Sequence, residues 1–194
     1  MSMKHVSDGS FQAWATPRPL AAALVEEFDL VLDVAADTHN TVCPAFFDGS
    51  EGSDGLLSPW LAPGQGVWCN PPYADVPSWL SKASEEVLVL GNCVRAVLLV
   101  PAAVGVRWFT LACSIAEVNL FDQRIRFDPP PRELLSQELQ QSLFKENGAP
   151  KSSPGGGNAL LVIERGGLRG ITGLRSAETG RLMIDFLDGQ TYEP

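Results

Sequence analysis

The chain has 194 residues, of which 45% are hydrophobic and 19% are charged, so it can bury one core and does not resemble a disordered chain. Its 18 glycines and 15 prolines indicate many short connections and argue against a helical bundle. The formal net charge is −9, and residues 1–123 carry all of the excess, with 5 Lys and Arg against 14 Asp and Glu. A nucleic-acid partner would therefore have to meet local positive groups, most of which follow residue 123.

The first predicted elements are a helix and a buried strand. Apolar residues recur every four positions over residues 16–28, which predicts a helix with Thr16 as its cap and Pro17 in its first turn. The short apolar run at 29–36 contains Asp33 and ends on small residues. This pattern is typical of a buried parallel strand whose carboxyl end is functional.

The remaining elements alternate between strand and helix. Residues 37–66 predict a long loop with one short strand near 42–47. The expected strands that follow are 66–70, 95–101 and 117–121, and the expected helices between them are 76–90 and 106–116. This alternation predicts an open, mostly parallel α/β sheet with helices on both faces, in which ligands bind at the carboxyl ends of strands.

The last third of the chain is less regular. Residues 128–157 contain three consecutive prolines, a polar helix around 132–145 and a glycine run, which indicates a surface insertion. Residues 158–163 predict a last core strand. The tail from residue 166 is weakly patterned, with a possible edge strand at 182–187.

The sequence gives no sign of a metal site or a membrane segment. The cysteines and the two histidines are widely spaced and form no CxxC cluster, so we expect no bound metal and four reduced thiols: Cys43, Cys69, Cys93 and Cys113. Residues 1–10 lack the apolar core of a signal peptide. The longest apolar run, 94–106, is too short to cross a bilayer. We therefore expect a cytoplasmic protein.

The tetrapeptide Asn70-Pro71-Pro72-Tyr73 is the most informative motif, because its groups suit a planar amine. An exocyclic or amide nitrogen is a poor nucleophile while its lone pair is delocalised. Accepting hydrogen bonds from both of its N–H groups favours a pyramidal nitrogen whose lone pair points at an electrophile. The Asn70 side-chain oxygen and the Pro71 carbonyl are the expected acceptors, and the two prolines fix the backbone. Tyr73 offers a face for stacking.

A rigid turn with an incidental tyrosine would explain the tetrapeptide alone equally well. Its position directly after a predicted strand, with the acid-ended strand of Asp33 upstream, favours the functional interpretation. Both sites follow strands of one parallel sheet, so we expect them to share a pocket.

Seven segments resemble, in order, the phage-type adenine-N6 DNA methyltransferases, a short family that includes phage-encoded Dam-like enzymes. These segments are 14–17, 32–36, 67–73, 98–102, 108–109, 124–127 and 159–163. The resemblance assigns residues 11–165 to a methyltransferase domain and leaves 166–194 as a C-terminal extension. It implies a Rossmann-like fold of the class I S-adenosylmethionine-dependent methyltransferases.

The same resemblance implies a cofactor site for S-adenosylmethionine. Its expected residues are Thr16, Pro17, Asp33, Ala35, Ala36 and Asp54. The first two would contact the methionine carboxylate, the next three would line the methionine and ribose side, and Asp54 would lie near the adenine. A solvated strand-end carboxylate is the alternative for Asp33, and a plain turn residue is the alternative for Asp54.

For the substrate, the resemblance implies site-specific methylation at N6 of a flipped-out adenine in double-stranded DNA, by a phage or prophage protein in the cytoplasm of a bacterial host. Tyr73, Arg124 and Arg126 would contact this DNA, although the two arginines fit a solvated strand edge equally well. Methylation of a protein glutamine or an RNA base, and a non-catalytic remnant of the fold, remain the alternatives. The sequence shows no separate DNA-recognition domain.

Overall fold

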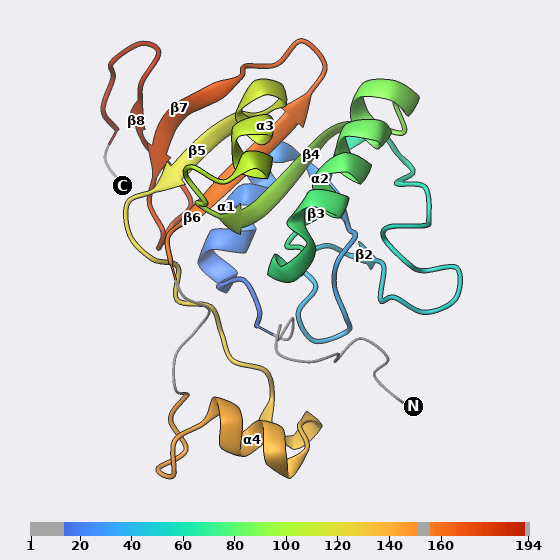
Figure 1. Cartoon of the computed structure of the whole chain (residues 1–194), viewed down its shortest axis with the longest axis vertical. Helices are drawn as coiled ribbons and strands as arrows, with labels where there is room; N and C mark the ends of the chain where they lie inside the picture. Colours follow the sequence, from blue (N-terminus) through green and yellow to red (C-terminus); the bar gives the residue numbers. More distant parts are fainter. Residues whose placement is uncertain (1–13, 151–155, 193–194) are drawn as a thin grey trace.

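An eight-stranded sheet organises the chain, which the computed structural model describes over residues 14–150 and 156–192 (Figure 1). The strand order is β2-β1-β3-β4-β6-β5-β7-β8. The strands are β1 (Leu30–Asp33), β2 (Ala45–Phe46), β3 (Ala62–Cys69), β4 (Cys93–Pro101), β5 (Glu117–Phe121), β6 (Asn158–Glu164), β7 (Gly170–Arg175) and β8 (Leu182–Asp185). The α-helices are α1 (Arg18–Phe28), α2 (Val76–Ser84), α3 (Arg107–Ile115) and α4 (Gln137–Leu143).

The sheet is mixed. Strands β2, β1, β3 and β4 pair in parallel, and β5 pairs in parallel with β7. Strand β6 is antiparallel to both of its neighbours, β4 and β5, and β8 is antiparallel to β7. All described strands except β6 and β8 therefore run in one direction, so their carboxyl ends lie along the same edge of the sheet.

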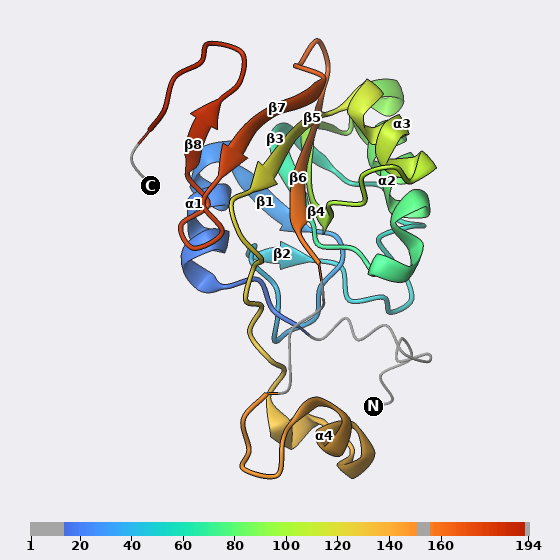
Figure 2. The ribbon, with the colours of Figure 1, turned by 60° about the vertical axis from the view of Figure 1, so that its left-hand side comes forward.

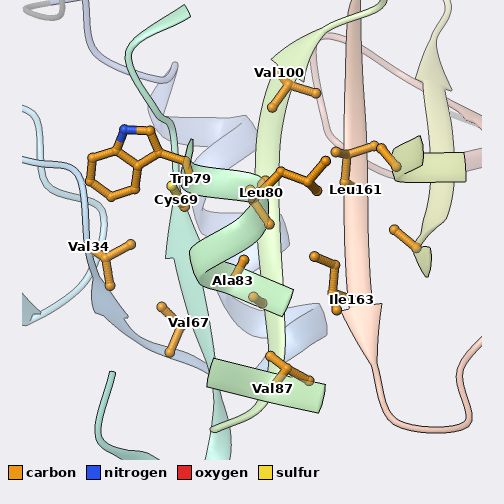
Figure 3. Close-up of a cluster of buried hydrophobic side chains, with 14 of the residues drawn as sticks. Val34, Val67, Cys69, Trp79, Leu80, Ala83, Val87, Val100, Leu161 and Ile163 are labelled. Carbon is orange, nitrogen blue, oxygen red and sulfur yellow. The ribbon is translucent and has the colours of Figure 1, made fainter. Parts of the chain in front are cut away.

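The helices cover both faces of this sheet (Figure 2). Helix α1 lies on one face, over a core cluster that includes Leu20, Leu24 and Phe28, and α2 and α3 lie on the other face. Figure 3 shows the core on the α2 side, where Trp79 and Leu80 lie among buried side chains of β3, β4 and β6. None of the helices in the described residues has the length and apolar character needed to span a bilayer.

Two helices differ from their prediction. Helix α1 begins at Arg18, and its N-cap is Pro17, which makes no side-chain hydrogen bond, so Thr16 is not the cap. The helix expected over 76–90 divides into α2 and the π-helical η2 (Glu85–Leu90). Buried Glu86 in η2 pairs with Lys82 and accepts hydrogen bonds from the Trp60 amide and the Asn92 side chain. The turn is held by polar contacts, which apolar periodicity does not report.

Strand β3 begins four residues before its predicted start. Its register against β1 and β4 shifts near Gly66, where an added Cβ would lie 2.6 Å from the Phe28 carbonyl oxygen. A side chain at this position would collide with the α1–β1 connection, so only glycine allows this close approach.

Strand β7 was not predicted, because glycines and a charge interrupt its apolar pattern. Gly173 packs close to the Ile184 carbonyl of β8, and Arg175 at the strand's end is buried. Strand β8 forms the sheet edge within residues 182–187. Backbone pairing with β5 and β8, together with the buried Arg175 side chain, therefore holds β7 on the sheet.

Arg175 links this tail to α1. Its guanidinium makes two hydrogen bonds of 2.6 Å to the Glu27 carboxylate, and its Nε donates to the Asn119 side-chain oxygen. The Arg175 side chain is 4% exposed and that of Glu27 is 42% exposed. Removing Glu27 would thus leave a buried charge without its carboxylate.

We expect Glu27→Ala to lower the free energy of unfolding. Breaking a fully buried pair costs about 3–5 kcal/mol, and partial exposure of Glu27 reduces the expected loss to about 2–3 kcal/mol. Urea denaturation measures this loss, and Glu26→Ala, which removes an exposed carboxylate from the same helix, is the matched control. Equal midpoints for the two variants would show that Arg175 does not depend on Glu27.

Candidate active site

Three polar residues lie along the carboxyl edge of the sheet. Asp33 ends β1 and lies opposite Trp68 of β3, so Asn70 follows two residues further along the same edge. Strand β6 runs the other way, and its first residue, Asn158, lies opposite Pro101 at the end of β4. The topology thus brings Asp33 and Asn70 to one edge, as the sequence predicted, and adds Asn158.

Asp33 is a buried carboxylate, only 2% exposed, so it is not a solvated strand end. Its Oδ1 accepts a hydrogen bond from the Ala35 amide at 3.3 Å and its Oδ2 accepts one from the Val42 amide at 3.1 Å. Burial raises the pKa of Asp33 to about 7, against these two hydrogen bonds, and nearby Asp37 adds a smaller rise. Asp33 therefore holds the loop after β1 and is poised to change charge near neutral pH.

This raised pKa has a consequence for stability. The folded-state pKa of Asp33, about 7, lies above its ordinary value of 3.8, so the folded chain keeps a proton that the unfolded chain has lost. The free energy of unfolding should therefore fall as pH rises from about 4 to about 7 and level off above. Between pH 5 and pH 7.5 the Asp33 contribution should fall by about 2–3 kcal/mol. Asp33→Asn lacks this component, so urea denaturation of both proteins at the two pH values isolates it. A parallel pH dependence in wild type and variant would contradict the assignment.

The tetrapeptide makes a rigid exit from β3. Asn70 and Pro72 are half-buried and Pro71 is buried. The Pro72 carbonyl accepts a hydrogen bond of 2.9 Å from the Asp75 amide. This bond closes the short 3-10 helix η1 (Tyr73–Asp75), which precedes α2. The Pro72 carbonyl is therefore engaged in this turn.

Tyr73 is held by two residues that are distant in sequence. Its hydroxyl oxygen accepts a hydrogen bond of 3.0 Å from the Asn158 side-chain amide. Its ring meets the Phe127 ring edge to face, with centroids 6.5 Å apart and planes at 77°. Burial raises the pKa of Tyr73 above its ordinary value, so the hydroxyl stays neutral. Sequence reasoning missed both partners, and the only available signal was a polar residue opening an apolar strand.

The segment before α1 lies beside the residues that follow β5. The backbones of Ala15 and Asp128 exchange two hydrogen bonds of 2.9 Å. Thr16 is buried and Pro17 is half-buried. The structure therefore places Thr16 and Pro17, the expected contacts of the methionine carboxylate, next to the segment that contains Arg126.

Asp54 organises a turn. Its Oδ1 accepts hydrogen bonds from the amides of Leu56 and Leu57 at 2.8 and 3.3 Å, which fits the plain turn residue. The adjacent Gly55 presses on the end of β1, since an added Cβ would lie 2.0 Å from the Val34 carbonyl oxygen. The turn is thus close to β1, although the Asp54 carboxylate binds the amides of its own turn.

The segment after β5 alternates between exposed and buried side chains. Arg124 and Arg126 are exposed, whereas Ile125 and Phe127 are buried. The arginines therefore face solvent while their neighbours anchor the segment on the α1-side core cluster.

The described residues do not form a cluster of metal-binding side chains at this edge. No group of three or more His, Cys, Asp or Glu side chains there could hold an ion. The four cysteines are free thiols, and burial raises the pKa of Cys43 and of Cys93 to about 12. These thiols are thus protonated and unreactive at neutral pH.

Comparison with known proteins identifies the family. The family model of DNA N-6-adenine-methyltransferase (Dam) matches residues 4–165. The chain belongs to this family. A curated relative, the DNA N-6-adenine-methyltransferase of Escherichia phage T1, is 32% identical over 109 residues, which cover 56% of this chain and 43% of the relative. The aligned part is thus less than half of that relative's length.

Membership of the Dam family confirms the resemblance inferred from the seven sequence segments that occur in the same order as in the family. The match ends at residue 165, just after β6, so β7 and β8 lie outside the matched region while extending the same sheet. Asp33 and the tetrapeptide both lie inside the Dam match, at the sheet edge described above.

Proposed function

We propose that this chain transfers a methyl group from S-adenosylmethionine to the N6 amine of adenine in double-stranded DNA. The observation that carries the proposal is the position of the Asn70–Tyr73 tetrapeptide directly after β3, beside buried Asp33 at the end of β1, in a chain of the Dam family. The two strands are parallel neighbours, so a cofactor at one strand end and an amine at the other would be adjacent.

We also infer the Rossmann-like fold of class I S-adenosylmethionine-dependent methyltransferases. The parallel block β2-β1-β3-β4, the helices on both faces and the polar carboxyl edge support it. Residues 11–165 would form the methyltransferase domain, with 128–157 as a surface insertion, and 166–194 would be an extension whose strands β7 and β8 continue the sheet. Residues 11–13, 151–155 and 193–194 of these ranges lie outside the described residues.

The residues at the end of β1 fit a cationic cofactor. A carboxylate as buried as Asp33 is costly to ionise without a partner, and the ammonium and sulfonium groups of S-adenosylmethionine would supply positive charge. Asp33, Ala35 and Ala36 would line its methionine and ribose side, and Thr16 and Pro17 its carboxylate. Asp54 would lie near the adenine of the cofactor while its carboxylate keeps its hydrogen bonds to the Leu56 and Leu57 amides. The bound cofactor supplies an electrophilic methyl group.

The tetrapeptide would act on the amine. The Asn70 side-chain oxygen and the Pro71 carbonyl would accept hydrogen bonds from the two N–H groups of the N6 amine, and Pro72 would fix the backbone between these acceptors and Tyr73. A paired adenine cannot reach these acceptors, so the base would leave the helix, at a cost of a few kcal/mol, and stack on Tyr73.

A methyl-transfer assay tests this function against its alternatives. Protein and labelled S-adenosylmethionine are incubated in parallel with duplex DNA, RNA and a mixture of proteins, and DNA products are digested to identify the methylated nucleoside. N6-methyladenine in DNA supports the proposal. Label in RNA or on protein glutamine would replace it with one of the alternatives. Cofactor binding without transfer to any substrate would indicate a non-catalytic remnant.

Arg124 and Arg126 should make the phosphate contacts, because residues 1–123 hold the excess negative charge and both arginines are exposed. Replacing both with alanine should weaken DNA binding and reduce the slope of log affinity against log salt by about one for each lost contact. Fluorescence anisotropy at several salt concentrations measures this slope, and Arg169→Ala, an exposed arginine before β7, is the control. An unchanged slope would mark the two arginines as structural.

A further inference from the structure

The connection between β5 and β6 contacts Tyr73 near both of its ends. Its outgoing part carries Phe127, whose ring meets the Tyr73 ring, and it returns at Asn158, whose amide donates to the Tyr73 hydroxyl. Strand β5 ends and β6 begins at the carboxyl edge, so the connection is rooted there. Both ends of the connection are therefore anchored beside the proposed catalytic tyrosine.

Residues 129–150, which we call the arm, are shaped by contacts of their own. The Gln140 side-chain amide donates to the carbonyls of Arg132 and Leu135 at 2.9 and 3.0 Å. The Arg132 guanidinium lies 4.9 Å from the centre of the Phe144 ring. Leu143 packs against the α1-side core cluster and so fixes the arm to the body.

The arm stands apart from the layers of the fold. Both ribbon views place α4 beyond the carboxyl edge of the sheet and away from α1, α2 and α3 (Figures 1 and 2). Within its residues the structure shows no strand that joins the sheet. The arm thus projects from the same edge as the site and contacts the core cluster through Leu143.

The solvent face of α4 presents hydrogen-bonding groups and little positive charge. Its exposed side chains are Gln137, Glu138, Gln141 and Ser142, whose spacing puts them on adjacent faces of the helix. The arm holds two cationic residues against three carboxylates, so it is not a phosphate-binding patch. Glutamine can pair with an adenine edge, glutamate with the cytosine amine, and serine with either, and an α-helix fits the major groove. The composition therefore suits base edges.

Resting on the proposed methylation of DNA, we propose that the arm is the element that reads DNA sequence, with α4 in the major groove next to the extruded adenine. The exposed arginines at 124 and 126, on the outgoing root, would hold the phosphates, and α4 would contact the neighbouring base pairs. This division between positioning and reading contacts is general in protein–DNA recognition.

The test is the sequence preference of a double variant, Gln137→Ala with Gln141→Ala. Duplexes with one adenine in randomised flanks are incubated with protein and cofactor, and the methylated products are sequenced. The wild type should select particular flanking bases. The double variant should lose about 10- to 100-fold in kcat/KM on the selected sequence and relax the preference at one or two positions. Its affinity for S-adenosylmethionine and its unfolding midpoint should match the wild type. Gln190→Ala, an exposed glutamine beyond β8, is the matched control and should change nothing.

Failure of this proposal is distinguishable from failure of the proposed function. A double variant with the wild-type preference, or a wild type that methylates adenine equally in every context, overturns the arm as a reader while methylation stands. A uniform loss at all flanks together with a smaller salt slope shows phosphate contacts and also overturns base reading. A wild type that binds cofactor and methylates no DNA overturns both.

Discussion

Replacing Asn70 with alanine should strongly lower turnover on duplex DNA and leave the affinity for the cofactor unchanged. The Asn70 side-chain oxygen is expected to accept a hydrogen bond that strengthens as the amine becomes pyramidal, so its loss is confined to the transition state. Removing one such preorganised group costs about 100- to 1000-fold in kcat. Single-turnover kinetics with labelled cofactor measure this loss, and calorimetry measures the affinity for S-adenosylmethionine.

Asp33→Asn provides the reciprocal variant. It keeps the size of a side chain that contacts the Ala35 and Val42 amides and removes its charge, so it should weaken cofactor binding. Comparison of the two variants separates binding from chemistry. Equal cofactor affinity in wild type and Asp33→Asn would remove Asp33 from the cofactor site, and an Asn70→Ala enzyme with near wild-type turnover would remove the tetrapeptide from the chemistry.

Apolar periodicity predicted the centre of the fold. Leu20, Leu24 and Phe28 repeat at helical spacing and are buried in α1, and the runs that became β1, β4 and β6 are nearly continuous in apolar residues. These elements bury one face or both faces against the same core, so their sequences carry the signal directly.

The elements that were missed depend on polar contacts over long distances in sequence. Strand β7 is held by Arg175 through Glu27, which lies 148 positions earlier in the chain. A local pattern cannot report such a partner. The expected polar helix around 132–145 is instead two short pieces, η3 (Arg132–Leu134) and α4, which the Gln140 side-chain amide joins by donating hydrogen bonds to the carbonyls of Arg132 and Leu135.

The candidate site shows the same division. The positions of Asp33 and Asn70 followed from strand ends, because parallel neighbours share an edge. The contacts of Phe127 and Asn158 with Tyr73 could not be predicted, since they depend on where the connection between β5 and β6 leaves and returns. The prediction for Tyr73 is sharpened by these contacts.

Replacing Tyr73 with alanine should lower activity on duplex DNA by roughly 10- to 100-fold, because base–aromatic stacking contributes about 1–3 kcal/mol. Tyr73→Phe and Tyr73→Trp keep a ring and should lose far less. A 2-aminopurine at the target position should brighten on binding the wild type, as an extruded base does, and brighten less with Tyr73→Ala.

The Asn158 contact separates stacking from stability in this series. Tyr73→Phe removes the hydroxyl that accepts a hydrogen bond from the buried Asn158 side-chain amide. It should therefore lower the free energy of unfolding by about 1–3 kcal/mol while it keeps the stacking surface. Tyr73→Phe should thus unfold at lower urea than wild type and still methylate well at a temperature where it is folded. Tyr73→Ala should lose both properties. If Tyr73→Ala methylates duplex DNA as fast as wild type when folded, the ring serves only to pack against Phe127 and the stacking role is wrong.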